Sequence, residues 1–335
     1  MLRLSFILPC YNVAPYIGRC LDSIEHQDMP QLDYEVICVD DCSEDNTVDV
    51  VKNYQKQYDN IRLICHKENK TAGGARNTGL DAARGEYIWF VDPDDSVVEN
   101  TIAGLYTKAQ SNKLDILFFN KQVCGEDGKK ISKNPLPEIS DATKGQEFFM
   151  SYFPAKRMAS VTSVWAELFS RDFIIKNCIR FPEIKSSQDV VFLWRSFLLA
   201  ERVLTDKAVA YNHYRRSDST TGSVGKYKAK HVISSSLLYV DELGKIIEVP
   251  MEERLRNDIL FGMRNAVNDN SRKVLRMSGK ERRLFYDEMK NYSDLIERHK
   301  WIMNSKTKQI FNYRLPYYLW LSMIYCYKFK DRVLV

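Results

Sequence analysis

Short apolar runs alternate with segments of helical spacing over the first hundred residues, and this alternation constrains the fold more than any other feature. Residues 3–8 form an apolar run ended by a proline, and residues 33–40 form a second run rich in Val and Ile. Both are typical of buried strands. Between them Ile17, Leu21 and Ile24 recur at the spacing of one helix face. The pattern predicts a strand, a helix and a second strand.

The alternation continues to residue 91. We expect strands at residues 61–65 and 86–91, with a helix over residues 75–83 that Gly85 closes. Strands that alternate with helices predict an α/β fold with a mostly parallel, Rossmann-like sheet covered by helices on both faces. Such sheets bind ligands at the carboxyl ends of their strands, where the polar clusters of this chain fall.

The following part of the chain is less regular. A helix is expected over residues 97–110 and a strand over residues 115–120, before the turn-rich residues 124–137 break the alternation. A helix over residues 188–201 and a strand over residues 208–214 come next. These elements predict a second, irregular half of the same domain.

The length of 335 residues predicts two domains, or one large domain with an appendage. We place the first at residues 1–225, with halves at 1–100 and 101–225. We place the second at residues 226–335, where long charged segments with apolar spacing, such as 231–247 and 251–267, predict helices.

The basic charge of the chain lies in its C-terminal third. Residues 226–335 carry 22 basic and 13 acidic side chains, whereas residues 1–225 carry 27 and 31. This asymmetry favours an anionic partner, and we expect peripheral contact with an anionic membrane. The 13 largely apolar residues 315–327 are too few to span a bilayer, which needs about 20, but suit an interfacial helix. The alternative is a solvated or packed helical surface.

Cysteine usage and the N-terminus bear on the compartment. Eight cysteines show no CxxC pair and no zinc-like spacing, so we expect reduced, buried thiols. The chain enters an apolar run at once, without the pattern of a signal peptide. We therefore expect a cytoplasmic protein, at the inner face of the plasma membrane if the C-terminal region binds lipid.

Three carboxylates at Asp92, Asp94 and Asp95 follow the expected strand at residues 86–91, and Pro93 stiffens their turn. Like charges this close need a counter-cation, and Mg²⁺ or Mn²⁺ takes hard oxygen ligands while keeping positions open for phosphates. The alternative is a helix N-cap, because a helical pattern follows.

Two other strand ends carry polar groups. Residues 40–47 form an acidic turn in which an Asp can accept hydrogen bonds from a base or a ribose, although Ser43 or Asp45 could instead cap a helix. Residues 73–79 open a helix with three glycines and Arg76, an arrangement suited to a phosphate. Neither the Walker spacing nor GxGxxG is present.

Five segments in order resemble the family 2 glycosyltransferases, which have the GT-A fold. They cover the opening strand and loop at residues 5–12, the turn at 39–43, the helix start at 74–79, a DxD motif at 92–94 and Ser-Gln-Asp at 187–189. The resemblance spans residues 3–222. It implies a nucleotide-diphosphate sugar as donor, with uridine as the expected base, and a divalent metal as cofactor.

The resemblance also implies roles for individual residues. Asp189 would be the catalytic base and Asp94 the metal ligand. The nucleotide-sugar would contact Pro9, Tyr11, Asn12, Asp41, Arg76, Asp92, His213 and Arg215. Among these, Pro9, Tyr11 and Asp41 would hold the base, Asp92 the ribose, and His213 or Arg215 the departing diphosphate.

Two positions depart from the family pattern. Cys42 stands where glycine is common, and a side chain there tolerates a positive φ poorly. Gln188 replaces a Glu before the base, which removes a negative neighbour and would lower the pKa of Asp189.

The charges imply a mechanism. A carboxylate base removes the proton of an acceptor hydroxyl while a metal neutralises the leaving diphosphate, and one base without a nucleophilic carboxylate implies inversion. The resemblance implies that the acceptor is a glycan or lipid-linked glycan of bacterial surface polysaccharide synthesis. Rival interpretations are a sugar-nucleotide nucleotidyltransferase and a non-catalytic binder of anionic surfaces. Nucleic acid is not expected, because the basic region lacks an aromatic-interleaved RNA-binding motif.

Some residues are interpreted as structural. His26, His66, His231 and His299 are scattered without evident carboxylate partners and are expected at the surface or satisfied in the core. Residues 121–133 are expected to form a solvated basic hairpin.

Overall fold

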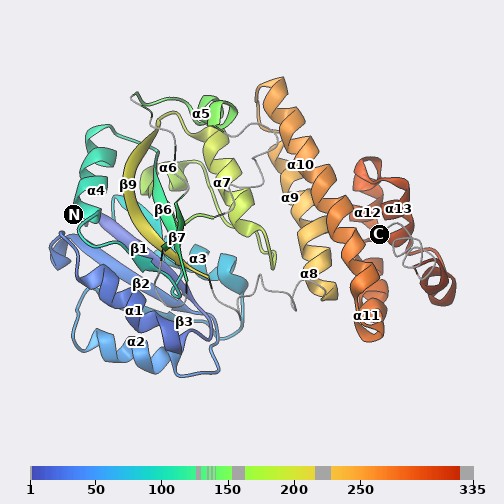
Figure 1. Cartoon of the computed structure of the whole chain (residues 1–335), viewed down its shortest axis with the longest axis horizontal. Helices are drawn as coiled ribbons and strands as arrows, with labels where there is room; N and C mark the ends of the chain where they lie inside the picture. The colour runs from blue at the N-terminus through green and yellow to red at the C-terminus, as the bar shows by residue number, and fades with distance from the viewer. Residues whose placement is uncertain are drawn as a thin grey trace. The chain divides into compact units, whose positions relative to one another are not determined.

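The computed structural model of the chain describes residues 2–125, 130–133, 136, 139, 141–152, 163–215 and 228–324. Contacts divide the chain into two compact units (Figure 1). The first comprises Met1–Glu183 and Gln188–Arg216, and the second comprises Ile184–Ser187 and Ser217–Val335.

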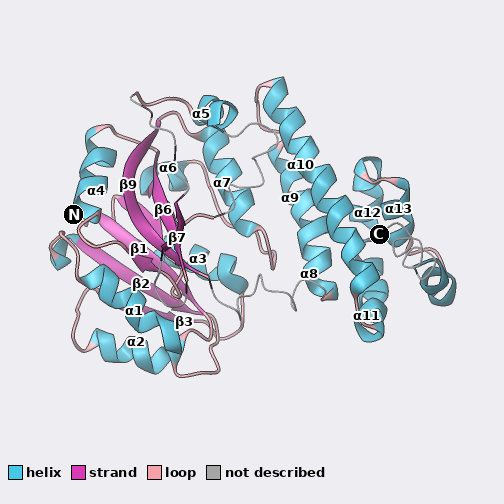
Figure 2. Cartoon of the chain, in the orientation of Figure 1, coloured by secondary structure: helices cyan, strands magenta, loops and turns pink. Residues whose placement is uncertain are grey.

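The first unit is an α/β structure (Figure 2). Its strands are β1 (Leu4–Cys10), β2 (Tyr34–Asp40), β3 (Ile61–Cys65), β4 (Tyr87–Phe90), β5 (Ser96–Val97), β6 (Ile116–Cys124), β7 (Lys130–Lys133), β8 (Glu167–Ser170) and β9 (Val203–Tyr214). Its helices are α1 (Ala14–Glu25), α2 (Thr47–Gln55), α3 (Thr71–Ala82), α4 (Ile102–Ser111), α5 (Gly145–Tyr152), α6 (Arg171–Lys176) and α7 (Gln188–Leu199), with a 3-10 turn at Gln31–Asp33.

The described strands form one mixed sheet in the order β3-β2-β1-β4-β8-β6-β9-β5, and β7 pairs with β6. The first four strands are parallel, with β1 and β2 in register from Leu4 opposite Tyr34 to Cys10 opposite Asp40. β8 runs antiparallel to both β4 and β6, and β9 is parallel to β6. The expected mostly parallel sheet is therefore confirmed, with β8 interrupting it.

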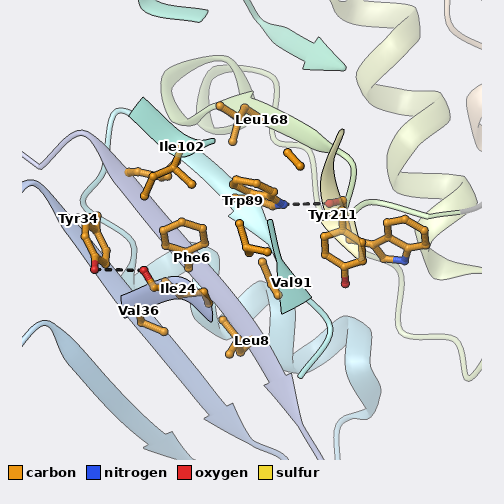
Figure 3. Close-up of a cluster of buried hydrophobic side chains, with 14 of the residues drawn as sticks. Phe6, Leu8, Ile24, Tyr34, Val36, Trp89, Val91, Ile102, Leu168 and Tyr211 are labelled. Atoms are coloured by element: carbon orange, nitrogen blue, oxygen red, sulfur yellow. Dashed lines mark hydrogen bonds between the residues drawn. The ribbon is translucent and has the colours of Figure 1, made fainter. Parts of the chain in front are cut away.

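Alternate residues of β1 point to opposite faces of the sheet. Phe6 and Leu8 belong to a core that also holds Ile24 of α1 (Figure 3). Within this core the Tyr34 hydroxyl donates to the Ile24 carbonyl at 3.3 Å. On the other face a Cβ at Gly79 of α3 would lie 2.3 Å from the Ile7 side chain, so glycine lets this helix approach the sheet. Both faces are covered by helices, as expected.

Several expected bounds were wrong. α3 begins at Thr71 rather than at residue 75, and β9 begins at Val203 rather than at residue 208. The helix expected from residue 97 starts only at Ile102, because Ser96 and Val97 pair with β9 instead. Asn100 then has a φ of 55°, which is left-handed backbone and delays the helix.

The described secondary-structure elements of the second unit are helices, which confirms the expected C-terminal helical region. Its helices are α8 (Ala229–Ile233), a π-helical turn (Ser234–Leu238), α9 (Tyr239–Ile246), α10 (Glu253–Arg272), α11 (Gly279–Met289), α12 (Ser293–His299) and α13 (Ser305–Ile310). Met263, Phe285 and Trp320 are buried in its core. No helix within the described residues has the length and apolar character needed to cross a membrane.

The cysteines differ in part from expectation. The seven that the structure describes are free thiols, as predicted. Cys65 and Cys178 are exposed rather than buried. Cys326 and the last part of the 315–327 segment lie outside the described residues.

Candidate active site

Loops that follow β1, β2 and β4 meet at one edge of the sheet, because the carboxyl ends of parallel strands lie side by side. The backbone N–H of Asp41, just past β2, donates to the Cys10 carbonyl at 2.8 Å. Asn12 ties the first two loops together, since its Oδ1 accepts from the Glu44 N–H and its own N–H donates to the Ser43 hydroxyl. Pro9 is buried within β1, whereas Tyr11 is 48% exposed.

Asp41 is 2% exposed and closely coordinated by the chain. Its Oδ1 lies 2.7 Å from His66 Nδ1 and accepts from the Lys70 backbone N–H at 2.7 Å. His66 Nε2 lies 2.8 Å from the Thr78 hydroxyl. His66 is therefore a satisfied core histidine, as expected. Its carboxylate partner is not evident from the sequence, because Asp41 lies 25 positions earlier and follows another strand.

The turn after Asp41 has a positive φ at Cys42, although this residue replaces the glycine that is common at that position. Cys42 takes a φ of 65°, so the chain places a side chain in left-handed backbone. Its thiol donates to the His66 carbonyl at 3.2 Å, which anchors the residue there. Asp45 is not the N-cap of a helix, because Asn46 holds that position in α2. Its carboxylate instead accepts the N–H groups of Thr47 and Ala14, the first residues of α2 and α1.

Arg76 on α3 joins two carboxylates from distant parts of the chain. Its side chain is 4% exposed, and its guanidinium donates from NH1 to Asp189 Oδ1 at 2.7 Å and from NH2 to Asp92 Oδ1 at 2.8 Å. Burial opposes the charged form, but the carboxylates of Asp189 and Asp92 raise the pKa of Arg76 above its ordinary value. The structure thus brings three of the predicted site residues into direct contact.

Asp189 lies in the first turn of α7, with 23% of its side chain exposed. Burial raises its pKa to about 6, although the Arg76 cation lowers it and Asp92 raises it further. We expected Gln188 to lower the pKa of Asp189. Desolvation of the Asp189 carboxylate has the larger effect, so this pKa is raised. Ser187, directly before the helix, has a φ of 65° and turns the chain into α7.

Asp92, Asp94 and Asp95 have carboxylate oxygens within 4.8 Å of one another. Asp95 is buried, and its oxygens accept from the Tyr211 hydroxyl at 2.8 Å and the Tyr214 N–H at 2.8 Å. Its partners are therefore on β9, which fixes the turn against that strand. The N-cap alternative for this turn was wrong, because β5 and not a helix follows it.

His213 and Arg215 lie at the end of β9. His213 Nδ1 is 3.2 Å from Asp95 Oδ2, and this hydrogen bond raises the pKa of the imidazole. Arg215 is exposed, and its backbone N–H donates to the Cys124 carbonyl at 2.9 Å. The structure thus places His213 directly beside the acidic turn, and it places Arg215 at the exposed strand end.

Comparison with known proteins identifies the family of this chain. The sequence profile described as Glycosyl transferase family 2 matches residues 5–164. The glycosyltransferase GlyG of Streptococcus pneumoniae is 30% identical over 229 residues, which cover 64% of this chain and 72% of that protein. This chain belongs to glycosyltransferase family 2.

The chain matches only part of several other relatives. The poly(ribitol-phosphate) beta-glucosyltransferase of Bacillus spizizenii is 31% identical over 227 residues, 67% of this chain but 34% of that protein. The chain spans between 34% and 63% of the length of the first three curated relatives that it matches. The structure of Staphylococcus aureus TarS in complex with UDP-GlcNAc matches this chain with a TM-score of 0.65 at 24% identity. The match covers 93% of this chain and 87% of the TarS chain. The likeness confirms the GT-A fold.

A second group of residues lies beside His213, and sequence reasoning missed it. The Trp165 ring stacks on Tyr211 and His213, with centroids 4.5 and 5.2 Å apart, and Lys121 Nζ lies 4.0 Å from its centroid. Glu167 on β8 is 4% exposed, and burial raises its pKa to about 8. Burial lowers the pKa of Lys121.

Lys121 was expected in a solvated hairpin. It lies instead within β6. The antiparallel pairing of β6 with β7 confirms that the segment forms a hairpin, but not that Lys121 is solvated. Residues 126–129 of that segment lie outside the described residues. No motif marks Lys121, Trp165 or Glu167 in the sequence, because their proximity arises from pairing between distant strands.

Proposed function

We propose that the protein is an inverting glycosyltransferase that moves a sugar from a nucleotide-diphosphate sugar to a hydroxyl of a glycan or lipid-linked acceptor. The observation that carries the proposal is the buried bridge in which Arg76 holds Asp189 and Asp92 together. It places one carboxylate with a raised pKa beside an acidic turn at the ligand-binding edge of the sheet.

Asp189 is assigned the role of catalytic base. An acceptor hydroxyl is a poor nucleophile near neutral pH, and a carboxylate with a pKa of about 6 accepts a proton more readily than an ordinary Asp does. No second carboxylate is assigned to attack the sugar. A single displacement with inversion at the anomeric carbon follows.

The donor is assigned to the loops after β1, β2 and β4. The nucleoside base is placed against Pro9, Tyr11, Asn12 and Asp41, and the ribose near Asp92. Asp41 is preorganised for this role, because His66 and Lys70 hold one of its oxygens. Uridine is the proposed base, since TarS of similar fold was solved with UDP-GlcNAc.

Other residues contribute to the donor site in different ways. Arg76 acts through Asp92, because both of its terminal nitrogens are engaged by carboxylates. His213 and Arg215 are assigned to the departing diphosphate, and the raised pKa of His213 favours its cationic form.

A divalent metal, Mn²⁺ or Mg²⁺, fits the acidic turn. The carboxylate oxygens there are the hard donors that these ions prefer, and Asp94 and Asp92 are both partly exposed. Asp94 is the proposed ligand, because Asp95 is buried with its oxygens bound to β9. When bound, such a metal would neutralise charge on the diphosphate.

The acceptor and the site of action are proposed from the relatives. Two of them are named as poly(ribitol-phosphate) glycosyltransferases, so we infer a role in bacterial surface polysaccharide synthesis at the cytoplasmic side of the membrane. Trp301 and Tyr318 of the helical unit are 55% and 79% exposed, and the region is basic. These features support peripheral contact with anionic lipid. Flotation of the full chain with anionic and neutral liposomes tests it, and equal recovery in solution from both would contradict it.

The donor proposal is tested by thermal shift with UDP, GDP, TDP and CMP, each with and without Mn²⁺. A ligand that binds only the folded state raises the melting temperature by mass action. We expect a metal-dependent rise for UDP and a loss of that rise in Asp94→Ala. Absence of a rise for every nucleotide would contradict the transferase proposal, and transfer by Asp189→Asn at the wild-type rate would contradict the base.

A further inference from the structure

A pocket of about 520 Å³ adjoins the acidic turn and has no assigned role. Residues of α1, β5, β6 and β9 line it, among them Arg19, Asp22, Ser96, Gln122, Asn212 and Tyr214. Ser96 directly follows Asp95, and Arg19 NH2 donates to the Asp94 carbonyl at 2.6 Å. The volume lies within the range of about 300–1,000 Å³ that is common for small-molecule sites.

The pocket contains a buried amide with an unused acceptor. Gln122 is 5% exposed, and its Nε2 donates to Asn212 Oδ1 at 2.5 Å, while Asn212 Nδ2 donates to the Ser96 hydroxyl at 3.0 Å. The Gln122 Oε1 atom is buried and has no hydrogen-bond partner. An unsatisfied buried acceptor destabilises the folded state, so a ligand that donates a hydrogen bond there would recover stability.

The charges and the aromatic ring indicate the kind of ligand. Arg19 is a cation among the lining residues, and its guanidinium already lies 3.6 Å from the Tyr214 ring centroid. Asp22 and Glu99 add two carboxylates, which disfavour a phosphate. Amides, hydroxyls and carboxylates around a tyrosine suit a neutral ligand with many hydroxyl groups.

We propose that this pocket is a subsite for an uncharged saccharide of the acceptor glycan. The inference rests on the proposed transferase function, because it places the glycan next to the acidic turn at which the donor is assigned. A sugar hydroxyl donates to Gln122 Oε1, and the Tyr214 side chain forms part of the wall. Such a subsite lets the enzyme select its acceptor by a sugar unit that does not react.

The test is saturation-transfer NMR of the full chain with the methyl glycosides of glucose, galactose and N-acetylglucosamine, and with inorganic phosphate. UDP and Mg²⁺ are present throughout, which keeps the sugars from the donor site and avoids paramagnetic Mn²⁺. The variants are Gln122→Leu, which removes the amide at similar size, and Tyr214→Ala. Gln110→Leu on the exposed surface of α4 is the matched control.

We expect at least one glycoside to bind the wild type and Gln110→Leu equally, and to bind both pocket variants about 3- to 10-fold more weakly. Melting curves of each variant identify any that fails to fold, and the other pocket variant then decides. Unchanged glycoside binding in both folded variants, absence of glycoside binding to the wild type, or binding of phosphate alone would each overturn the proposal. The signals of UDP in the same samples separate this outcome from failure of the donor proposal.

Discussion

The guanidinium of Arg76 and the carboxylate of Asp189 are 2.7 Å apart, although 113 positions separate the two residues in the chain. Arg76 is 3% exposed, so the pair is formed away from bulk water. A buried cation that contacts two carboxylates fixes their positions, and loss of one partner leaves an uncompensated charge. The bridge therefore links α3, the acidic turn and the start of α7 into one unit.

Replacing Arg76 tests this bridge. Arg76→Ala should destabilise the fold by about 3–5 kcal/mol in urea unfolding, because Asp189 and Asp92 lose their shared cation. Arg76→Lys should fold but lose turnover, since a single ammonium cannot bind two carboxylates bidentately. The midpoint of its pH–rate profile should also move upward, because a more distant cation stabilises ionised Asp189 less.

Arg180→Lys is the matched control for that substitution. Arg180 also pairs with a carboxylate, Asp81 at 2.6 Å, but both side chains are exposed. We expect little change in stability or in the pH profile for it. An Arg76→Lys enzyme with the wild-type rate and pH midpoint would show that the bridge has no part in catalysis.

The pH dependence of transfer follows from Asp189. The base must be ionised, so with a pKa of about 6 the rate should be level above pH 7 and fall about tenfold per pH unit well below 6. Asp189→Asn should lower kcat by about 10²- to 10⁴-fold and remove this acid limb. Asp172→Asn changes an exposed carboxylate and should retain both the wild-type kcat and the acid limb. A wild-type rate that stays constant from pH 5 to 7 would contradict the assignment.

Asp94 and Asp95 are adjacent but should respond differently to removal. Asp94→Ala should abolish the effect of Mn²⁺ on nucleotide binding, and it should change the melting temperature of the ligand-free protein less than Asp95→Ala does. Asp95→Ala should lower that melting temperature, because Tyr211 and Tyr214 lose a buried acceptor at about 1–3 kcal/mol each. Differential scanning fluorimetry with and without Mn²⁺ measures both, and interchanged results would reverse the two roles.

The sequence predicted the parts of this structure that depend on local pattern. The apolar runs located β1, β2 and β4, and parallel pairing then brings Asp41 and Asp92 to the same edge of the sheet. The contacts of those residues depend on tertiary packing instead. His66 beside Asp41, Tyr211 on Asp95 and Lys121 over Trp165 each join distant positions, and nothing in the spacing of the chain specifies them.

Close packing of α3 on the sheet gives a prediction about Gly79. A Cβ at this position would lie 2.3 Å from the Ile7 side chain in β1, so Gly79→Ala should destabilise the fold by about 1–3 kcal/mol. Gly104→Ala in α4, where a Cβ meets nothing within 4 Å, is the control and should be neutral or stabilising by up to about 1 kcal/mol. Equal unfolding free energies for the two variants would show that α3 does not need glycine there.

Glu167 should make the stability of the protein depend on pH. Burial raises its pKa from 4.5 to about 8 in the folded chain, although Lys121 lowers it, so the folded state keeps a proton that the unfolded chain releases. Stability from this group is therefore present below about pH 4.5 and is lost as the pH rises toward 8. Glu167→Gln keeps an acceptor for the Ala166 N–H but cannot titrate. In urea unfolding at pH 5, 6.5 and 8, the unfolding free energy of the variant should rise relative to that of the wild type with each increase in pH. A difference that stays constant or narrows as the pH rises would mean that Glu167 is already ionised in the folded protein at pH 5.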